Sequence, residues 1–280
     1  MLSIKEQLVL LYCTVDDLLK NQIRGGEWRQ SNNKPRCTDA EILVVAMMQS
    51  YFRTDTLKQT YLLVKANDAT AFPDLPGYKQ WLARLHRVGY QSGAMMFYIP
   101  FRVEELDGIY LVDSYPIRMC EPIRHGRVRL LREDGAYFGN GSKGWFFGFK
   151  LHVISTRNGQ IIGAILTAGN VDDRDGARYL LDYLEEEGIA IADLGYRGTN
   201  FQAEIYETNG VLFITRADIT DEELKKVHSL VRTRVETIFS ELWRRFANRV
   251  YARSWLGLWN TLQLKMLDYK LCHARMLPAN

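Results

Sequence analysis

The sequence predicts an α/β fold in which a mixed sheet with flanking helices follows a mostly helical N-terminal region. Residues 1–104 contain helix-start signals and lack long β-branched runs. After about residue 105, short apolar runs typical of strands appear and then alternate with helical segments. Strands that come first and then alternate with helices indicate a mixed sheet. We therefore expect two domains, residues 1–104 and 105–280.

In the first domain, residues 3–6 and 38–41 match the Ser/Thr-x-x-Glu capping box that begins a helix. Glycine, asparagine and proline within 25–35 predict a loop between these two helices. The stretch 72–77, with two prolines and a glycine, breaks the next helical segment. A further helix is expected from about Tyr78.

In the second domain, apolar runs rich in β-branched and aromatic residues predict strands. We expect strands at 109–113, 127–131, 145–155, 160–167, 189–193 and 211–215. Helical periodicity predicts helices at about 173–187, 199–208 and 221–246.

The composition, 47% hydrophobic and 25% charged, is ordinary for a soluble globular protein. No apolar stretch approaches the roughly 20 residues needed to cross a bilayer, and the N-terminus lacks the pattern of a signal peptide. The four cysteines are far apart and show no metal-site or disulfide-framework spacing. We therefore expect a cytoplasmic protein with reduced thiols and no membrane partner.

The net charge of +3 is too small to indicate a nucleic-acid partner, but the charges are unevenly distributed. Residues 151–220 carry 11 acidic and 5 basic side chains, whereas residues 221–280 carry 6 acidic and 11 basic ones. Bound metal would help to offset the acidic excess, and the basic excess could hold a phosphate backbone.

Three carboxylates are candidates for metal chemistry. Asp113 ends the apolar run 109–112, Asp193 ends the run 189–192, and Glu236 lies at the border of the buried face of a predicted helix. Each has an ordinary alternative: the aspartates could cap the turns that follow them, and the glutamate could be solvated. A carboxylate at a strand's edge is costly to bury unpaired. Two strand-end aspartates and a helix glutamate could together hold two divalent metals, as in phosphoryl-transfer nucleases.

The blocks around these carboxylates resemble a DDE transposase of bacterial insertion sequences and are most similar to the IS982 family. The similar stretches are 72–78, 109–117, 147–152, 192–196 and 232–240, in the family's order. The carboxylates are 80 and then 43 residues apart. The resemblance covers most of the chain, and the ordered set of blocks is far more specific than any one block.

This resemblance implies a ribonuclease-H-like fold for 105–280 and the activity of a DNA transposase. It implies that Asp113, Asp193 and Glu236 are catalytic and hold two Mg²⁺ (or Mn²⁺) ions, about 3.5–4 Å apart. The enzyme would cleave at insertion-sequence ends and join the 3′-hydroxyl to target DNA. Its expected partners are double-stranded DNA (terminal inverted repeats and target DNA) and a second copy in a homodimeric synaptic complex. By analogy, residues 1–104 would recognise the terminal repeats and mediate dimerisation.

Two rival functions remain open at this point. One is a metal-dependent nuclease on the same fold without strand transfer, and the other is a catalytically silent DNA-binding remnant. The presence of all three carboxylates argues against the remnant.

A second acidic cluster is formed by Asp172, Asp173 and Asp175. The resembling family often has His-Asp here, so Asp172 in place of the histidine is a departure. We favour a helix N-terminus, where aspartates cap the helix and interact well with its dipole. Lys150 and His152 share one face of a predicted strand, either near the site or as half-exposed polar residues.

Arginines are the candidate DNA-binding residues. Arg232 lies one helical turn before Glu236 and could hold a phosphate or pair with that glutamate. The C-terminal candidates are Arg244, Arg245, Arg249 and Arg253. A further group of arginines lies within 118–132. For both groups the alternative is a solvated surface, although aromatic residues near the C-terminal group could stack on bases. Related transposases carry Tyr and Lys where this chain has Ser229 and Trp243.

Overall fold

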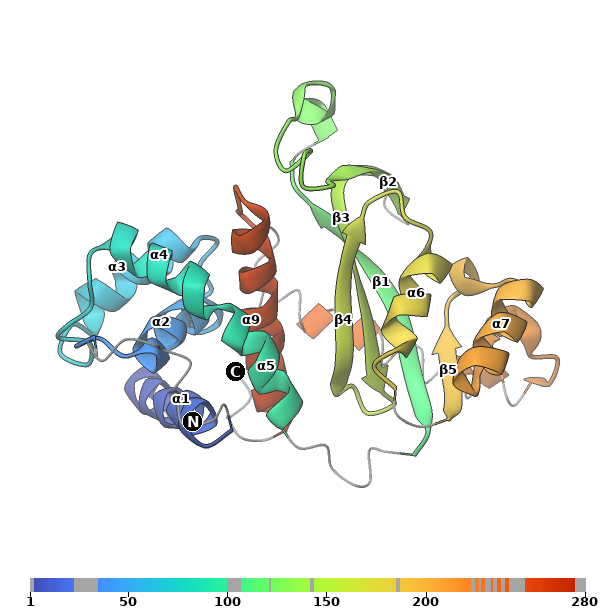
Figure 1. Cartoon of the computed structure of the whole chain (residues 1–280), viewed down its shortest axis with the longest axis horizontal. Coiled ribbons are helices and arrows are strands. Elements are labelled where there is room, and N and C mark those ends of the chain that lie inside the picture. The colour runs from blue at the N-terminus through green and yellow to red at the C-terminus, as the bar shows by residue number, and fades with distance from the viewer. Residues whose placement is uncertain are drawn as a thin grey trace. The chain divides into compact units, whose positions relative to one another are not determined.

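The structure is a computed structural model and is shown in Figure 1. It describes residues 3–22, 35–99, 107–120, 122–141, 144–184, 187–222, 225–226, 228–229, 233, 236–237, 240–241 and 250–274. The chain divides into two compact units, one formed by residues 1–100 with 242–280 and the other by residues 101–241.

The first unit is helical. Its helices are α1 (Ile4–Asp17), α2 (Asp39–Phe52), α3 (Leu57–Asn67), α4 (Tyr78–Val88), α5 (Tyr90–Tyr98) and α9 (Trp255–His273), with a π-helical segment at Leu18–Gln22. Ser3 with Glu6 and Thr38 with Glu41 form complete capping boxes, which confirms both predicted helix starts. The helix expected from Tyr78 is also confirmed.

Helix α2 is central to this unit, because its side chains from 42 to 50 are all buried. The C-terminal helix α9 completes the same core with Leu264, Leu267 and Leu271. The described residues 250–274 therefore belong to the helical unit, whereas the sequence prediction placed them with the second domain. The difference arises because the apolar residues of α9 contact helices that lie far away in the sequence.

The second unit contains the sheet. Its strands are β1 (Ile109–Arg118), β2 (Tyr137–Gly141), β3 (Gly144–Thr156), β4 (Ile161–Ala168), β5 (Gly188–Ala192) and β6 (Val211–Thr215). Their order is β2-β3-β1-β5-β6, and β4 pairs with β3. Strands β1, β3 and β4 are antiparallel neighbours, whereas β5 and β6 run parallel to β1. This mixed sheet confirms the predicted α/β, ribonuclease-H-like fold.

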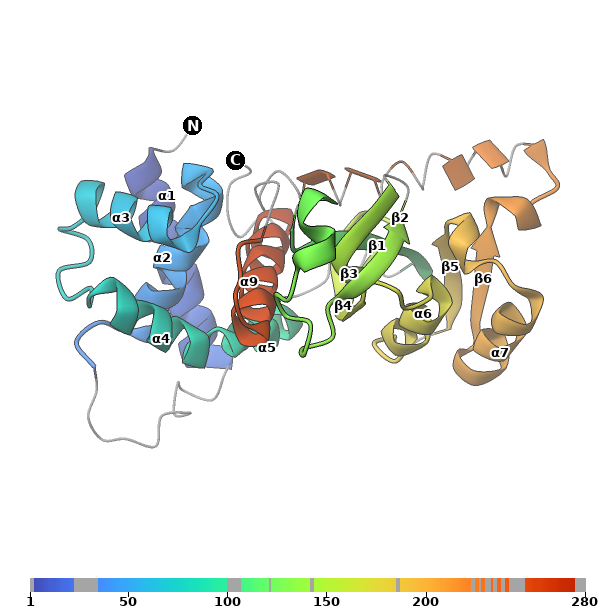
Figure 2. The ribbon, with the colours of Figure 1, turned by 90° about the horizontal axis from the view of Figure 1, so that it is seen from above.

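Helices α6 (Asp173–Leu181) and α7 (Thr199–Asn209) cover one face of the sheet. Apolar side chains from β1, β5 and β6 pack beneath them, including Val112 and Ala192. Every described residue between 225 and 241 is helical. Figure 2 shows the coloured pieces of this segment across the sheet from α6 and α7.

The structure differs from the prediction in three places. Residues 127–131 form no strand: the 3₁₀ helix η4 (Pro122–Arg127) and a turn stand there, and Leu131 has a φ of 55°. Strand β2 was not predicted, because its glycines and asparagine resemble a turn. Helix α6 ends at Leu181 rather than 187. In the part of the chain that the structure describes, no helix is long and apolar enough to cross a membrane.

Candidate active site

The register of the sheet brings the two strand-end aspartates together. In the parallel pair β1 and β5, Ile109 faces Ile189 and Leu111 faces Ile191. Continued for two residues, this register brings Asp113 level with Asp193. Neighbouring strands lie about 4.8 Å apart. Two residues that are 80 positions apart in the sequence are therefore expected about one strand spacing apart.

Both aspartates are half-buried and held by backbone N–H groups. The Ser114 N–H donates to Asp113 Oδ1 at 2.7 Å, and the Gly195 N–H donates to Asp193 Oδ1 at 2.5 Å. The second contact caps the short 3₁₀ helix η5 (Leu194–Tyr196), so the expected capping of a turn by Asp193 is present. Capping and a role in the site are therefore compatible for this residue.

Tyr196 is a buried residue whose pKa is affected by the nearby aspartates. Its side chain is fully buried in the core under α6 and α7. Burial raises the pKa of its phenol well above the ordinary value, and the negative charges of Asp113, Asp173 and Asp193 raise it further. The Tyr196 hydroxyl therefore lies within electrostatic range of all three carboxylates and stays protonated at any physiological pH.

Asp173 is the first residue of α6 and binds Ser114, the residue that follows Asp113 on β1. Its Oδ1 accepts hydrogen bonds from Ser114 Oγ at 2.8 Å and from Lys150 Nζ at 3.1 Å. Lys150 also donates to the carbonyl oxygen of Val171 at 2.9 Å. The expected helix cap is supplied by the neighbouring Asp172, which accepts from the Arg174 N–H. Lys150 thus lies near the site, one of the two possibilities that the sequence left open.

His152 supports α6 rather than the acidic site. Its ring is fully buried, and its Nε2 lies 2.8 Å from Thr167 Oγ1. Burial lowers the pKa of the imidazole to about 4, so the ring is neutral at pH 7. A Cβ on Gly176 would lie 2.4 Å from this ring, so α6 approaches the sheet closely only because residue 176 is glycine.

Glu236 is helical and exposed, and the helical pieces around it lie across the sheet from α6 and α7 (Figure 2). Val112 is buried beneath α6 and α7, so by strand alternation the following residue, Asp113, points away from them. Within the described ranges, no group of three His, Cys, Asp or Glu side chains is placed to share a metal. The two aspartates are therefore brought together, and the addition of Glu236 remains a prediction.

The predicted DNA-binding arginines are mostly outside the described residues. This holds for Arg232, Arg244, Arg245 and Arg249, whereas Arg253 is described and exposed just before α9. In the second unit, the arginines at 124, 127, 129 and 132 are exposed on η4 and the following turn. Arg118 instead packs over the Phe146 ring at 5.8 Å.

The donor set suits a hard divalent cation, because such ions prefer carboxylate oxygens. Gly195 has no side chain that could crowd these carboxylates. A Cβ at this position would lie 3.0 Å from Asp193 Oδ1 and 3.2 Å from Asp173 Oδ2. Sequence reasoning did not single out Gly195, Tyr196 or Ser114, although each stands within a block that carries the resemblance.

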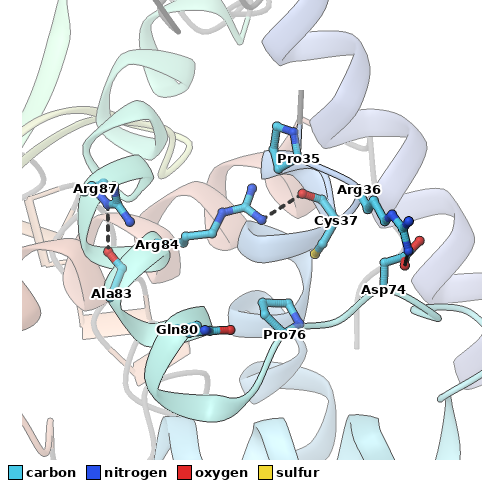
Figure 3. A pocket seen from close by; sticks show the side chains of 9 residues that line it. All are labelled: Pro35, Arg36, Cys37, Asp74, Pro76, Gln80, Ala83, Arg84 and Arg87. Atoms are coloured by element: carbon cyan, nitrogen blue, oxygen red, sulfur yellow. Dashed lines mark hydrogen bonds and ion pairs between the residues drawn. The ribbon is translucent and has the colours of Figure 1, made fainter. Parts of the chain in front are cut away.

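A cavity of about 440 Å³ lies in the first unit, and its arginine Arg84 makes contacts that stabilise the fold (Figure 3). It is lined by arginines, but Arg84 donates to the carbonyl oxygen of Cys37 at 2.8 Å and pairs with Asp39 at 2.6 Å. Burial raises the pKa of the Cys37 thiol to about 11, which makes it unreactive at pH 7. We therefore assign no chemistry to this cavity.

The mixed sheet with its flanking helices defines the class of this protein as a ribonuclease-H-like α/β fold. The family model described as "Transposase DDE domain" matches residues 103–248, just over half of the chain. The chain therefore belongs to the DDE transposase domain family. No curated protein and no solved structure gives a significant match.

We expect Gly195→Ala to weaken metal binding without unfolding the protein. The added methyl group would push against the carboxylates on both sides, while the backbone of Gly195 has no positive φ that excludes alanine. Disturbing the groups around metal ligands typically costs about 10- to 100-fold in metal affinity. Titration with Mn²⁺ measures this loss.

Gly126→Ala is the matched control for this variant, because a Cβ on Gly126 would meet nothing within 4 Å. Equal Mn²⁺ affinity of the Gly195→Ala and Gly126→Ala variants would show that the space beside Asp193 plays no part in metal binding.

Proposed function

We propose that this protein is a DNA transposase, of the kind encoded by IS982-type insertion sequences, acting by two-metal phosphoryl transfer. The observation that supports it best is the parallel register of β1 and β5, which, continued past Leu111 and Ile191, brings Asp113 level with Asp193 just after the end of β5. The family match over the whole sheet-containing unit supports the same function.

In this proposal Asp113, Asp193 and Glu236 hold divalent metal ions, with two Mg²⁺ (or Mn²⁺) expected. Such ions, when bound, polarise the scissile phosphate and lower the pKa of attacking water. The N–H groups of Ser114 and Gly195 fix the orientation of the two aspartate carboxylates. Fixed ligands reduce the reorganisation needed when the ions and the DNA bind.

The proposed chemistry has two phosphoryl transfers at one site. Water attacks the phosphorus at the end of the element, and the P–O bond to the 3′-oxygen breaks. The freed 3′-hydroxyl then attacks a phosphodiester of the target DNA. Neither transfer needs a covalent bond between protein and DNA, so no serine or tyrosine nucleophile is proposed.

A strand-transfer assay tests this function. Purified protein is incubated with a labelled duplex from the end of its element, a target plasmid and Mg²⁺. Joining of the label to the plasmid is the result we expect. Cleavage without joining would indicate a nuclease, and retarded migration without cleavage would indicate a silent DNA-binding protein.

Positive charge in the C-terminal segment is proposed to hold the DNA backbone. Replacing the four arginines with glutamine should weaken binding to all DNA sequences alike; they are Arg244, Arg245, Arg249 and Arg253. Each lost phosphate contact should reduce the slope of log affinity against log salt by about 0.9. Affinity measured between 50 and 200 mM salt checks this.

The helical region 1–104 is proposed to read the terminal repeats and to mediate dimerisation. Variants of its exposed helix faces should therefore lose preference for the terminal repeat while keeping nonspecific binding.

If the variant with all four C-terminal arginines replaced kept both its DNA affinity and its salt slope, those arginines would belong to a solvated surface instead.

A further inference from the structure

The carboxylate of Asp173 is turned toward the sheet although the residue begins a helix. The cap of α6 is formed by Asp172, whose Oδ1 accepts from the Arg174 N–H at 2.9 Å. The Arg174 guanidinium also binds Asp172 and lowers the pKa of that carboxyl to about 2. Asp173 therefore has no capping task, and its Oδ1 instead binds Ser114 and Lys150.

The ion pair between Asp173 and Lys150 is mostly withdrawn from solvent. The Lys150 side chain is 13% exposed and the Asp173 side chain 25%. Buried charges are normally kept only when they are paired and hydrogen-bonded. Here Lys150 meets this condition with two acceptors, since it also binds the carbonyl oxygen of Val171. The pair thus fastens the start of α6 to β3.

Asp173 binds Ser114 and lies close to Gly195, the two residues whose N–H groups donate to the candidate metal ligands. On β1 it holds the side chain of Ser114, whose N–H donates to Asp113 Oδ1. On the other side its Oδ2 lies 3.2 Å from the point that a Cβ on Gly195 would occupy, and Asp193 Oδ1 lies 3.0 Å from the same point. One carboxylate therefore adjoins the residues that orient Asp113 and Asp193.

We propose that Asp173, held by Lys150, is a positioning residue that sets the orientation of the Asp113 and Asp193 carboxylates for metal binding. This inference rests on the proposed function. Asp173 acts through Ser114 and the Gly195 turn, because its Oδ1 is already engaged by a cation and a hydroxyl group. Groups that orient metal ligands commonly contribute about 10- to 100-fold to metal affinity.

The test measures the Mn²⁺ affinity of the full-length protein without DNA, by the electron paramagnetic resonance of free Mn²⁺. Asp173→Ala should bind Mn²⁺ about 10- to 100-fold more weakly than the wild type. Asp173→Asn should lose less, because its side-chain oxygen can still accept from Ser114 and Lys150. If Asp173 served only to attract the cation, Asn and Ala would be equally poor.

Asp175→Ala is the matched control. Asp175 lies on the same turn of α6, is 58% exposed and pairs with Arg178, away from the strand-end aspartates. It should bind Mn²⁺ like the wild type. A purely structural role for Asp173 would lower the melting temperature of Asp173→Ala and leave the Mn²⁺ affinity of its folded protein unchanged, which would overturn the proposal.

Ser114→Ala keeps the test decisive if Asp173→Ala fails to fold. It removes only the hydroxyl that links Asp173 to β1, so weaker Mn²⁺ binding supports the proposal and unchanged binding overturns it. A wild-type protein without measurable Mn²⁺ binding would overturn the proposed function as well. Equal affinity of the wild type and Asp173→Ala would overturn the positioning role alone.

Discussion

Asp113→Asn and Asp193→Asn should each abolish DNA cleavage and joining while largely sparing DNA binding. Asparagine keeps the size of the side chain but removes the negative charge that attracts the metal ions. We expect a loss of roughly 10⁴-fold or more, as for other catalytic groups that act as one unit. Cleavage of a labelled terminal duplex and its retention in a gel shift measure the two activities separately.

The double variant provides a further check, because residues that act as a unit are not additive. Asp113→Asn combined with Asp193→Asn should be little worse than either change alone. Asp134→Asn, on an exposed turn of the same unit, is the control and should cleave normally. Substantial cleavage by either single variant would remove that aspartate from the site.

Glu236→Gln should abolish cleavage to a similar extent. Glu236 belongs to the segment 225–241, whose described pieces lie across the sheet from α6 and α7 (Figure 2), and strand alternation directs Asp113 toward that face. Glutamine preserves helix propensity at this exposed position, so any loss of activity reports on the carboxylate rather than on folding.

Glu241→Gln is the matched control for this variant, because Glu241 lies five residues later in the same helical segment. It should retain normal cleavage. If Glu236→Gln and Glu241→Gln were equally active, the third acidic ligand would have to be another residue.

The three parallel strands could be predicted from the sequence because each contains a short apolar run. These runs, in β1, β5 and β6, include β-branched residues, which are typical of strands. Which strands are neighbours could not be predicted from these runs, since pairing depends on contacts between distant residues. That β1 and β5 are parallel neighbours, with a register that leads toward Asp113 and Asp193, is therefore a finding of the structure alone.

The incorrect strand at 127–131 has a local cause. Its alternating arginines and apolar residues imitate strand periodicity, but Leu131 has a positive φ that closes a turn. Helix α9 was predicted as part of the second domain for a different reason. Its apolar residues are distributed around the helix and mark no single buried face that would indicate its packing partners.

The role of Asp173 shows the limit of local patterns. A run of aspartates before a helix correctly predicts a cap, and Asp172 provides it. The partner of Asp173 is Ser114, 59 residues earlier in the chain, and no local signal reveals such a contact. The residues that support the strand-end aspartates were therefore found only in the folded chain.

Backbone cleavage by bound Fe²⁺ tests most directly whether Asp113 and Asp193 bind the proposed catalytic metal ions. Fe²⁺ substituted for Mg²⁺ generates hydroxyl radicals that cut the protein backbone beside the bound ion, and mass spectrometry locates the cuts. We expect cuts within 111–115 and 191–197, both suppressed by excess Mg²⁺ and absent from Asp113→Asn. Cuts confined to other segments, or cuts unchanged in Asp113→Asn, would contradict the account.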